Sequence, residues 1–123
     1  MILVDTSVWI DHLRAGDATL TTLLEAEREL IHPFIIGELA LGSMRDRQTV
    51  LDALRDLPAA TPATDDEVQR MIDVVPLHGL DIGYVDAHLL ASLRLTGDSK
   101  LWTRDRRLLA AAERLQLVTH PAH

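Results

Sequence analysis

Apolar residues along the chain fall into short runs that alternate with longer segments of helical spacing. Three runs are too brief for a helix, which predicts buried strands at residues 2–4, 30–32 and 100–103. Still shorter strands are expected within 58–62 and at 117–119. Between the runs, apolar side chains recur every three or four positions, which predicts helices at residues 8–14, 19–29, 34–41, 46–57, 64–75, 84–95 and 104–115.

This alternation of short strands and helices favours an α/β fold, a sandwich around a mostly parallel sheet. The length of 123 residues suits one domain, so we expect residues 1–123 to form a single unit with a sizeable core. The absence of cysteine excludes a disulfide framework, a cysteine-ligated zinc site and a cysteine nucleophile. The apolar runs are too short to cross a membrane and the first has no basic region ahead of it, so we expect a cytoplasmic protein.

Charge is unevenly distributed along the chain. The formal net charge is −7, which argues against a protein that coats nucleic acid through general electrostatics. Residues 94–107 are different, because they hold five basic and two acidic side chains. One basic segment therefore lies in an otherwise acidic chain.

Four carboxylates occupy positions that packing alone does not explain. Asp5 and Asp105 each follow a predicted strand, and the carboxyl ends of parallel strands are where such sheets bind ligands. Glu38 and Asp86 lie on apolar helices instead. Each acid also has an ordinary interpretation. Asp5 and Asp105 would cap or begin the next helix, Asp86 would suit the helix dipole, and Glu38 would reach water from the edge of the apolar stripe.

Taken together, the four acids favour a metal site. In a sandwich of this kind they can converge at one edge of the sheet, where carboxylates repel one another unless a cation joins them. An all-oxygen ligand set without Cys or His suits a hard ion, Mg²⁺ or Mn²⁺. Such ions activate water and clamp phosphate oxygens in phosphodiester hydrolysis. The predicted metal ligands and catalytic groups are Asp5, Glu38, Asp86 and Asp105.

Four stretches, in this order, give the chain a family resemblance: ILVDTSVWIDHLR, IIGELALGS, GYVDAHLLAS and LWTRDRRL. Together they resemble the PIN-domain nucleases, and most closely the VapC-type toxins of bacterial toxin–antitoxin pairs. The resemblance implies a three-layer α/β/α sandwich, divalent-metal-dependent ribonuclease activity, a cognate antitoxin protein and a homodimer. By position it carries the acidic site onto the same four acids. The supporting hydroxyls that it implies are Thr6, Ser7 and Thr103.

With RNA as the implied substrate, the basic segment acquires a role beside the acids. The candidates for contacts with RNA phosphates are Lys100, Arg104, Arg106 and Arg107. The alternative is that the arginines form an ordinary solvated helix face. His88 stands where the family more often has an apolar residue, and helical spacing should point it away from Asp86.

Two other functions fit part of the pattern. A phospho-receiver-like, Mg-binding signalling domain shares the length, the α/β alternation and an acidic site. It needs a second acid beside Asp5 and another near residues 59–61, and the chain has neither. A catalytically inactive RNA-binding module is the other alternative, and intact acids at all four positions argue against it.

Overall fold

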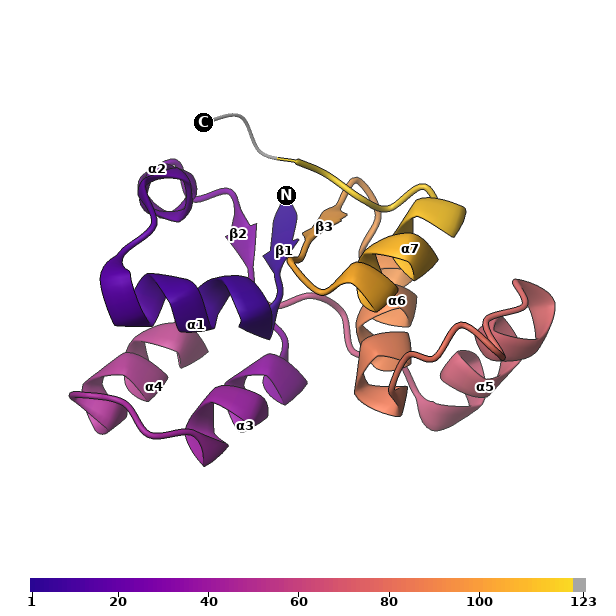
Figure 1. Cartoon of the computed structure of the whole chain (residues 1–123), viewed down its shortest axis with the longest axis horizontal. Coiled ribbons are helices and arrows are strands. Elements are labelled where there is room, and N and C mark those ends of the chain that lie inside the picture. The colour runs from indigo at the N-terminus through magenta and orange to yellow at the C-terminus, as the bar shows by residue number, and fades with distance from the viewer. Residues whose placement is uncertain (121–123) are drawn as a thin grey trace.

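Three short parallel strands form a sheet at the centre of the molecule (Figure 1). The computed structural model describes residues 1–120, so the last part of the predicted domain, residues 121–123, lies outside the described range. Strand β1 (Ile2–Val4) is the middle strand, between β2 (Glu29–Leu30) and β3 (Lys100–Trp102). The first strand therefore forms the centre of the sheet, where Leu3 and Val4 are fully buried, because β1 is paired on both sides.

Two isolated bridges extend this sheet where the sequence predicts very short strands. Ile31 bridges to Ala59, and Leu101 bridges to Val118. Each contact is a single parallel bridge and not a full strand. The sheet is consequently three strands wide along most of its length, with one extra residue pairing at each side.

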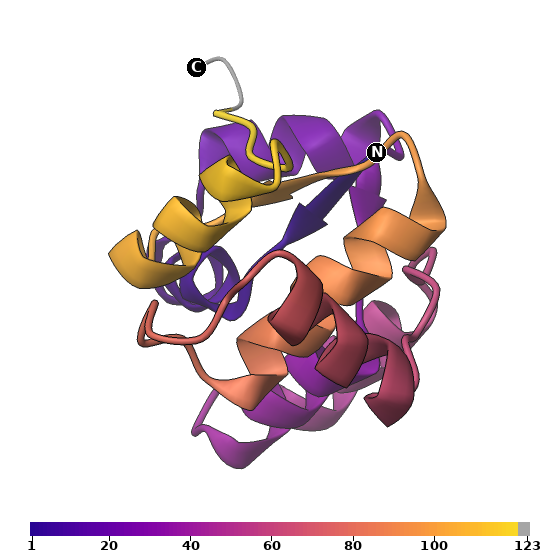
Figure 2. The same ribbon diagram turned by 90° about the vertical axis from the view of Figure 1, so that its right-hand side faces the viewer.

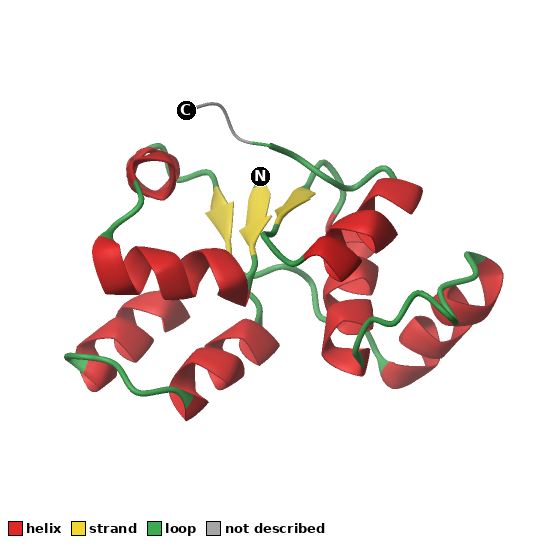
Figure 3. Cartoon of the chain, viewed as in Figure 1, coloured by secondary structure: helices red, strands yellow, loops and turns green. Residues whose placement is uncertain are grey.

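Helices cover both faces of the sheet, which gives the predicted three-layer α/β/α sandwich (Figure 3). In Figure 1 the first four helices lie on one side of the strands and the last three on the other, and Figure 2 shows α5 beside α6. The helices within residues 1–120 are α1 (Thr6–Ala15), α2 (Ala18–Glu25), α3 (Pro33–Leu41), α4 (Arg47–Arg55), α5 (Asp65–Val74), α6 (Tyr84–Thr96) and α7 (Arg106–Arg114).

Local signals in the sequence set several of these helix ends. The capping box at the start of α5 forms as its composition predicts: the Thr64 hydroxyl accepts from the Glu67 N–H, and the Glu67 carboxylate accepts from the Thr64 N–H. Helix α6 ends at Gly97, whose φ of 69° lies in the left-handed region that glycine enters without strain. These signals confirm that capping chemistry places the ends of both elements.

One predicted element is wrong at its carboxyl end. The apolar spacing predicts a helix over 19–29, yet α2 stops at Glu25. Glu27 adopts a φ of 55°, which ends helical hydrogen bonding and turns the chain back toward the sheet. Glu29 then pairs with Ile2 as the first residue of β2, where it is buried. Tertiary pairing with β1 thus overrides a helical periodicity that continues past the turn.

Helix α6 is the most buried helix of the fold. Its residues from Ala87 to Leu93 are all buried, including the polar His88 and Ser92. The sequence predicts a single apolar stripe, but α5 packs along α6 on the side that β3 leaves open. Burial on both sides places polar groups of α6 inside the protein. None of the helices in residues 1–120 is long and apolar enough to cross a membrane.

Candidate active site at the carboxyl edge of the sheet

Asp5 lies at the carboxyl end of the central strand, beside the end of β3. Val4 pairs with Trp102, and the Asp5 N–H donates to the Trp102 carbonyl over 3.0 Å. Parallel pairing therefore places residues 5 and 103 next to each other, although 98 positions separate them in sequence. The Thr103 hydroxyl donates to Asp5 Oδ2 over 2.8 Å, and the Ser7 hydroxyl donates to the same oxygen over 2.8 Å.

This arrangement decides between the two interpretations of Asp5. It occupies the N-cap position of α1, but its side chain makes no capping hydrogen bond. The carboxylate is buried and receives hydroxyl donors from two elements instead. Asp5 is therefore held as a side chain of the sheet edge, and the capping interpretation is wrong for this residue.

Asp105 has the capping role that its position predicts, and it also lies beside the hydroxyl that donates to Asp5. It is the N-cap of α7, where its Oδ1 accepts from the N–H groups of Arg107 and Leu108 over 2.9 and 3.2 Å. Its own N–H donates to the Thr103 hydroxyl over 3.0 Å. Within residues 1–120 the second carboxylate oxygen, Oδ2, has no hydrogen bond. Capping fixes the orientation of the side chain and leaves this oxygen available to a ligand.

Glu38 reaches the same edge from α3. Its carboxylate is exposed, as the ordinary interpretation predicts, and Oε1 accepts from the Thr6 hydroxyl over 2.8 Å. Thr6, Ser7 and Thr103 thus each donate to one of the predicted acids. The structure brings all three predicted hydroxyls to the acidic edge.

The pKa of Asp86 depends on its burial and on the charges of the other three acids. Burial in the first turn of α6, followed by the negative charge of Asp5, raises the pKa of Asp86 from 3.8 to about 6. The charges of Asp105 and Glu38 raise it further, and a hydrogen bond with the backbone of Gly83 opposes them. All three other acids are therefore close enough to repel Asp86, and its raised pKa shows that the present neighbours do not balance its charge.

The donor chemistry of this edge fits a hard divalent cation. All of the candidate ligands are carboxylate oxygens, and they carry mutual repulsion that a cation would relieve. No group of three or more acidic or histidine side chains within residues 1–120 is arranged so that it could hold a metal ion. Mg²⁺ commonly keeps several waters and uses one or two protein carboxylates with a substrate phosphate, so an open arrangement suits it.

Of the four predicted RNA contacts, Arg106 and Arg107 are exposed and directly follow Asp105 in the chain. Lys100 begins β3, at the opposite end of the strand from Asp105, and its Nζ donates to the Gln116 carbonyl. Arg104 is engaged by carboxylates, as described below. Arg106 and Arg107 lie in the first turn of α7, and Arg107 pairs with Asp81 over 3.0 Å on an exposed surface.

His88 points away from Asp86, as helical spacing predicts, and takes part in a second cluster. Its Nε2 lies 3.1 Å from Asp65 Oδ1, and its ring packs edge-on against Tyr84 and beside Phe34. This pairing links α6 to the start of α5. It depends on how two distant segments pack, so helical spacing gives its direction but not its partner.

Sequence reasoning missed a buried histidine next to this cluster. His32 Nδ1 accepts from the Phe34 N–H and caps α3, and its Nε2 lies 3.1 Å from the Ser92 hydroxyl. Burial, and then the charge of His88, lower the pKa of His32 from 6.5 to about 4. The position of His32 immediately before Pro33, the first residue of α3, is the local signal for a capping role.

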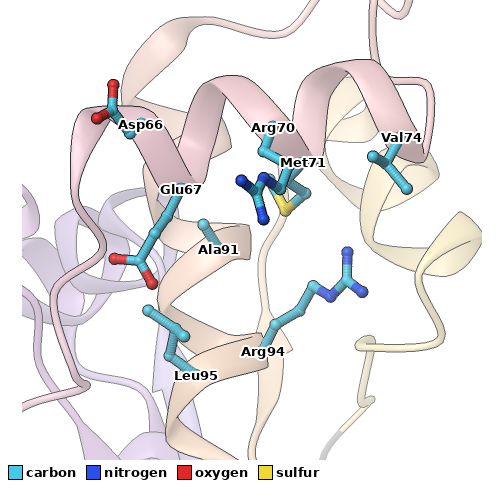
Figure 4. A pocket seen from close by; sticks show the side chains of 8 residues that line it. All are labelled: Asp66, Glu67, Arg70, Met71, Val74, Ala91, Arg94 and Leu95. Carbon is cyan, nitrogen blue, oxygen red and sulfur yellow. The ribbon is translucent and has the colours of Figure 1, made fainter.

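Surface hollows in the described part of the chain include two that lie outside the acidic edge or at its margin. One lies between α5 and α6, with Arg70 and Arg94 above an apolar floor that includes Met71 and Leu95 (Figure 4). It contains none of the four acids. The other is lined by side chains of α1 and α3, including Ile10 and Leu13, and has Glu38 in its wall.

Comparison with known proteins agrees with the geometry of this edge. The PIN domain family matches residues 2–114. The proteins named Ribonuclease VapC32 from two strains of Mycobacterium tuberculosis, CDC 1551 / Oshkosh and ATCC 25618 / H37Rv, are each 53% identical over 111 residues. The matched part covers 90% of this chain and 90% of each relative. The chain therefore belongs to the PIN-domain family, as its four sequence stretches predict.

Proposed function

We propose that this PIN-domain chain is a metal-dependent endoribonuclease that hydrolyses RNA phosphodiester bonds and acts as the toxin of a bacterial toxin–antitoxin system. The observation that carries the proposal is the convergence of Asp5, Glu38, Asp86 and Asp105 at one edge of the sheet, where the charges of the other three acids reach Asp86. Carboxylates that repel one another at a sheet edge are suited to a cation and a phosphate. The relatives named as ribonucleases support RNA as the substrate. The proposed nuclease domain spans residues 1–123.

In this proposal the chain's own residues supply a fixed frame for hydrolysis. The four acids would hold Mg²⁺ or Mn²⁺, with Asp5 oriented by Ser7 and Thr103. When bound, such a cation lowers the pKa of water and neutralises charge on the scissile phosphate. The pKa of Asp86 is raised to about 6, so near neutral pH this carboxyl group can still carry its charge. Water adds to phosphorus and the 3′ oxygen leaves with a proton, which yields a 5′-phosphate and a 3′-hydroxyl.

Substrate and partner would approach the acids from different sides. Arg106 and Arg107 in the first turn of α7 are exposed beside Asp105 and suit RNA phosphates. The hollow next to Glu38 offers exposed apolar side chains, Ile10 and Leu13, to an antitoxin segment. A basic side chain on that segment would take the place of the cation's charge. The antitoxin, a homodimer and a cytoplasmic location are parts of the proposal.

A metal-dependence assay tests the proposal directly. RNA cleavage by the purified chain should stop in excess chelator and return on addition of Mg²⁺ or Mn²⁺. An Asp86→Asn variant, purified in the same way, controls for contaminating nuclease and should stay inactive throughout. Undiminished cleavage in chelator would contradict the metal mechanism.

The same assay addresses the two alternatives. A catalytically inactive module would bind RNA without metal-dependent cleavage, and a phospho-receiver would bind the ion without acting on RNA. Neither alternative is favoured, because the chain is 53% identical to proteins named as ribonucleases and keeps all four acids.

A further inference from the structure

The Arg104 side chain is held between two carboxylates of the first two helices. Its Nη1 lies 2.6 Å from Asp11 Oδ2, and its Nη2 lies 2.6 Å from Asp17 Oδ2. Its guanidinium carbon lies 5.5 Å from the ring centre of Trp102. Both terminal nitrogens are thus occupied by acids of this chain, and the ring flanks the cationic group.

These contacts join segments that are far apart in the sequence. Asp11 lies in α1 and Asp17 caps α2, whereas Arg104 belongs to the link between β3 and α7. Sequence separations of 93 and 87 residues are bridged by one side chain. The link that carries Thr103 and Asp105 is therefore tied to the amino-terminal helices.

The backbone of Arg104 leads directly to the acidic edge. Its N–H donates to the Ser7 hydroxyl over 3.0 Å, and that hydroxyl donates to Asp5 Oδ2 over 2.8 Å. On one side of Arg104, the Thr103 hydroxyl donates to Asp5. On the other side, Asp105 is itself one of the four acids, and its N–H donates to Thr103. If Arg104 moved away from α1, Thr103, which donates to Asp5, and Asp105, which caps α7, would move with it.

Asp17 is a well-anchored partner for this arginine. Its other oxygen, Oδ1, accepts from the Leu20 N–H over 2.9 Å, so capping of α2 already fixes the carboxylate. That capping bond, and then the hydrogen bond from Arg104, hold the pKa of Asp17 below its ordinary value. Exposed ion pairs contribute little when both partners are mobile, but here one partner is pre-oriented and only 17% exposed.

We propose that Arg104 is a positioning residue for the nuclease site: through Asp11 and Asp17 it holds the link with Thr103 and Asp105 against α1. This inference rests on the proposed function for its effect on cleavage, and it replaces the sequence-based expectation that Arg104 contacts RNA. The guanidinium is used within the protein, so RNA binding falls to other side chains.

The two roles for Arg104 predict opposite effects when its acidic partners are neutralised. Asp11→Asn and Asp17→Asn leave the arginine in place but remove its ion pairs, and asparagine at position 17 still caps α2. If Arg104 contacts RNA, freeing it should tighten RNA binding and leave kcat unchanged. If it positions the link, kcat should fall while the Kd for RNA stays near that of a charge-matched control.

Asp52→Asn is that control, because it removes one exposed carboxylate that pairs with Arg55 on α4. We expect kcat to fall by about tenfold in Asp17→Asn and by a smaller factor in Asp11→Asn, since small misplacements of catalytic groups are costly. Arg104→Gln should behave as Asp17→Asn does, and the double variant should be no worse than Arg104→Gln alone. Arg104→Lys, a single point charge, should recover only part of kcat.

Hydrogen exchange of the metal-free protein, without RNA, supplies a second readout. The Arg104 and Asp105 amides donate to Ser7 and Thr103, and their exchange should accelerate about tenfold in Asp17→Asn but not in Asp52→Asn. Unchanged exchange, or tighter RNA binding with full kcat, would overturn the positioning role. A wild-type chain that cleaves no RNA would contradict the proposed function alone, because exchange still decides whether the ion pairs hold the link.

Discussion

Asp86 and His32 are both titratable, both withdrawn from solvent, and displaced in pKa by burial and by like-charged neighbours. At the acidic edge, burial and three carboxylates raise the pKa of Asp86 to about 6. At the junction of α3 and α6, burial and His88 lower the pKa of His32 to about 4. In each case the protein disfavours the charged form, although Asp86 must be charged to bind a cation.

The two regions differ in how their polar atoms are satisfied. Both nitrogens of His32 have partners within the protein, the Phe34 N–H and the Ser92 hydroxyl, so the neutral ring makes a hydrogen bond at each nitrogen. Asp105 retains an oxygen without a hydrogen bond within residues 1–120, and Asp86 faces repulsion from three acids. A buried polar group whose hydrogen bonds are complete, such as His32, supports the fold, whereas carboxylates that repel one another, such as Asp86 and Asp105, are suited to a cation.

The largest effect should be on cleavage, and at the acidic edge alone. Asp86→Asn should lower kcat/KM by about a hundredfold or more, because ligands that act as a unit fail together. Asp73→Asn, which removes an exposed acid of α5, should leave cleavage within about threefold. Rates with saturating Mg²⁺ measure both variants. Comparable losses in the two variants would mean that general charge, and not this site, controls the rate.

His32→Ala should instead lower stability. It removes a buried ring and leaves the Phe34 N–H and the Ser92 hydroxyl without their partner, which should cost about 2–3 kcal/mol. Urea unfolding measures this loss. His78→Ala, at an exposed loop position, should stay within about 0.5 kcal/mol of wild type. If His32→Ala and His78→Ala have the same free energy of unfolding, the hydrogen bonds of His32 do not stabilise the fold.

In the metal-free protein, Asp86→Asn should change stability in the opposite direction from His32→Ala. It should stabilise the protein by about 1 kcal/mol, because it relieves repulsion among carboxylates. Thermal melts in chelator measure this gain. Mg²⁺ should then raise the melting temperature of wild type more than that of the variant, since the variant binds the ion less well. Destabilisation in chelator, with equal responses to Mg²⁺, would identify Asp86 as a structural residue.

Lowering the pH should bring the stabilities of Asp86→Asn and His32→Ala closer to that of wild type, Asp86→Asn from above and His32→Ala from below. The folded pKa of Asp86 is raised from 3.8 to about 6, so its favourable contribution is present below 3.8 and is lost as pH rises through 6. The folded pKa of His32 is lowered from 6.5 to about 4, so its contribution is present above 6.5 and is lost as pH falls through 4.

From pH 7 to pH 4 in chelator, the stability gain of Asp86→Asn and the stability deficit of His32→Ala should therefore both shrink. Urea midpoints of the two variants and wild type, measured at each pH, test this convergence. Curves that remain parallel to wild type across the range would show that neither group is linked to folding as described.

The fold and the acidic edge were open to prediction because they depend on local patterns. Short apolar runs, capping residues, and the acids Asp5 and Asp105 that follow the first and third strands are visible along the chain, and parallel pairing brings those two acids to one edge. Capping interpretations were not decidable in the same way. Asp105 is a cap and Asp5 is not. Ser7 lies only two residues from Asp5, but Thr103 reaches Asp5 only after β3 has paired with β1.

Contacts between distant segments account for what the sequence did not predict. From the sequence alone, a basic residue beside an acidic site is expected to contact RNA. The fold brings Asp11 and Asp17 against Arg104, and no local pattern indicates these ion pairs. His32 has no helical neighbour that signals Ser92, which lies 60 residues away. The helix over 19–29 ended early for the same reason, since pairing of Glu29 with Ile2 decides where the chain leaves α2.

The bond between Thr103 and Asp5 has a consequence for how the protein is made. Asp5 directly follows β1, and one of its two hydroxyl donors, Thr103, directly follows β3 and is synthesised 98 positions later. A nascent chain that lacks β3 also lacks one neighbour of its central strand, and such long-range pairing forms late. The acids therefore come together only after β3 has been made and has paired with β1, so the acidic edge is completed later than the strand that carries Asp5.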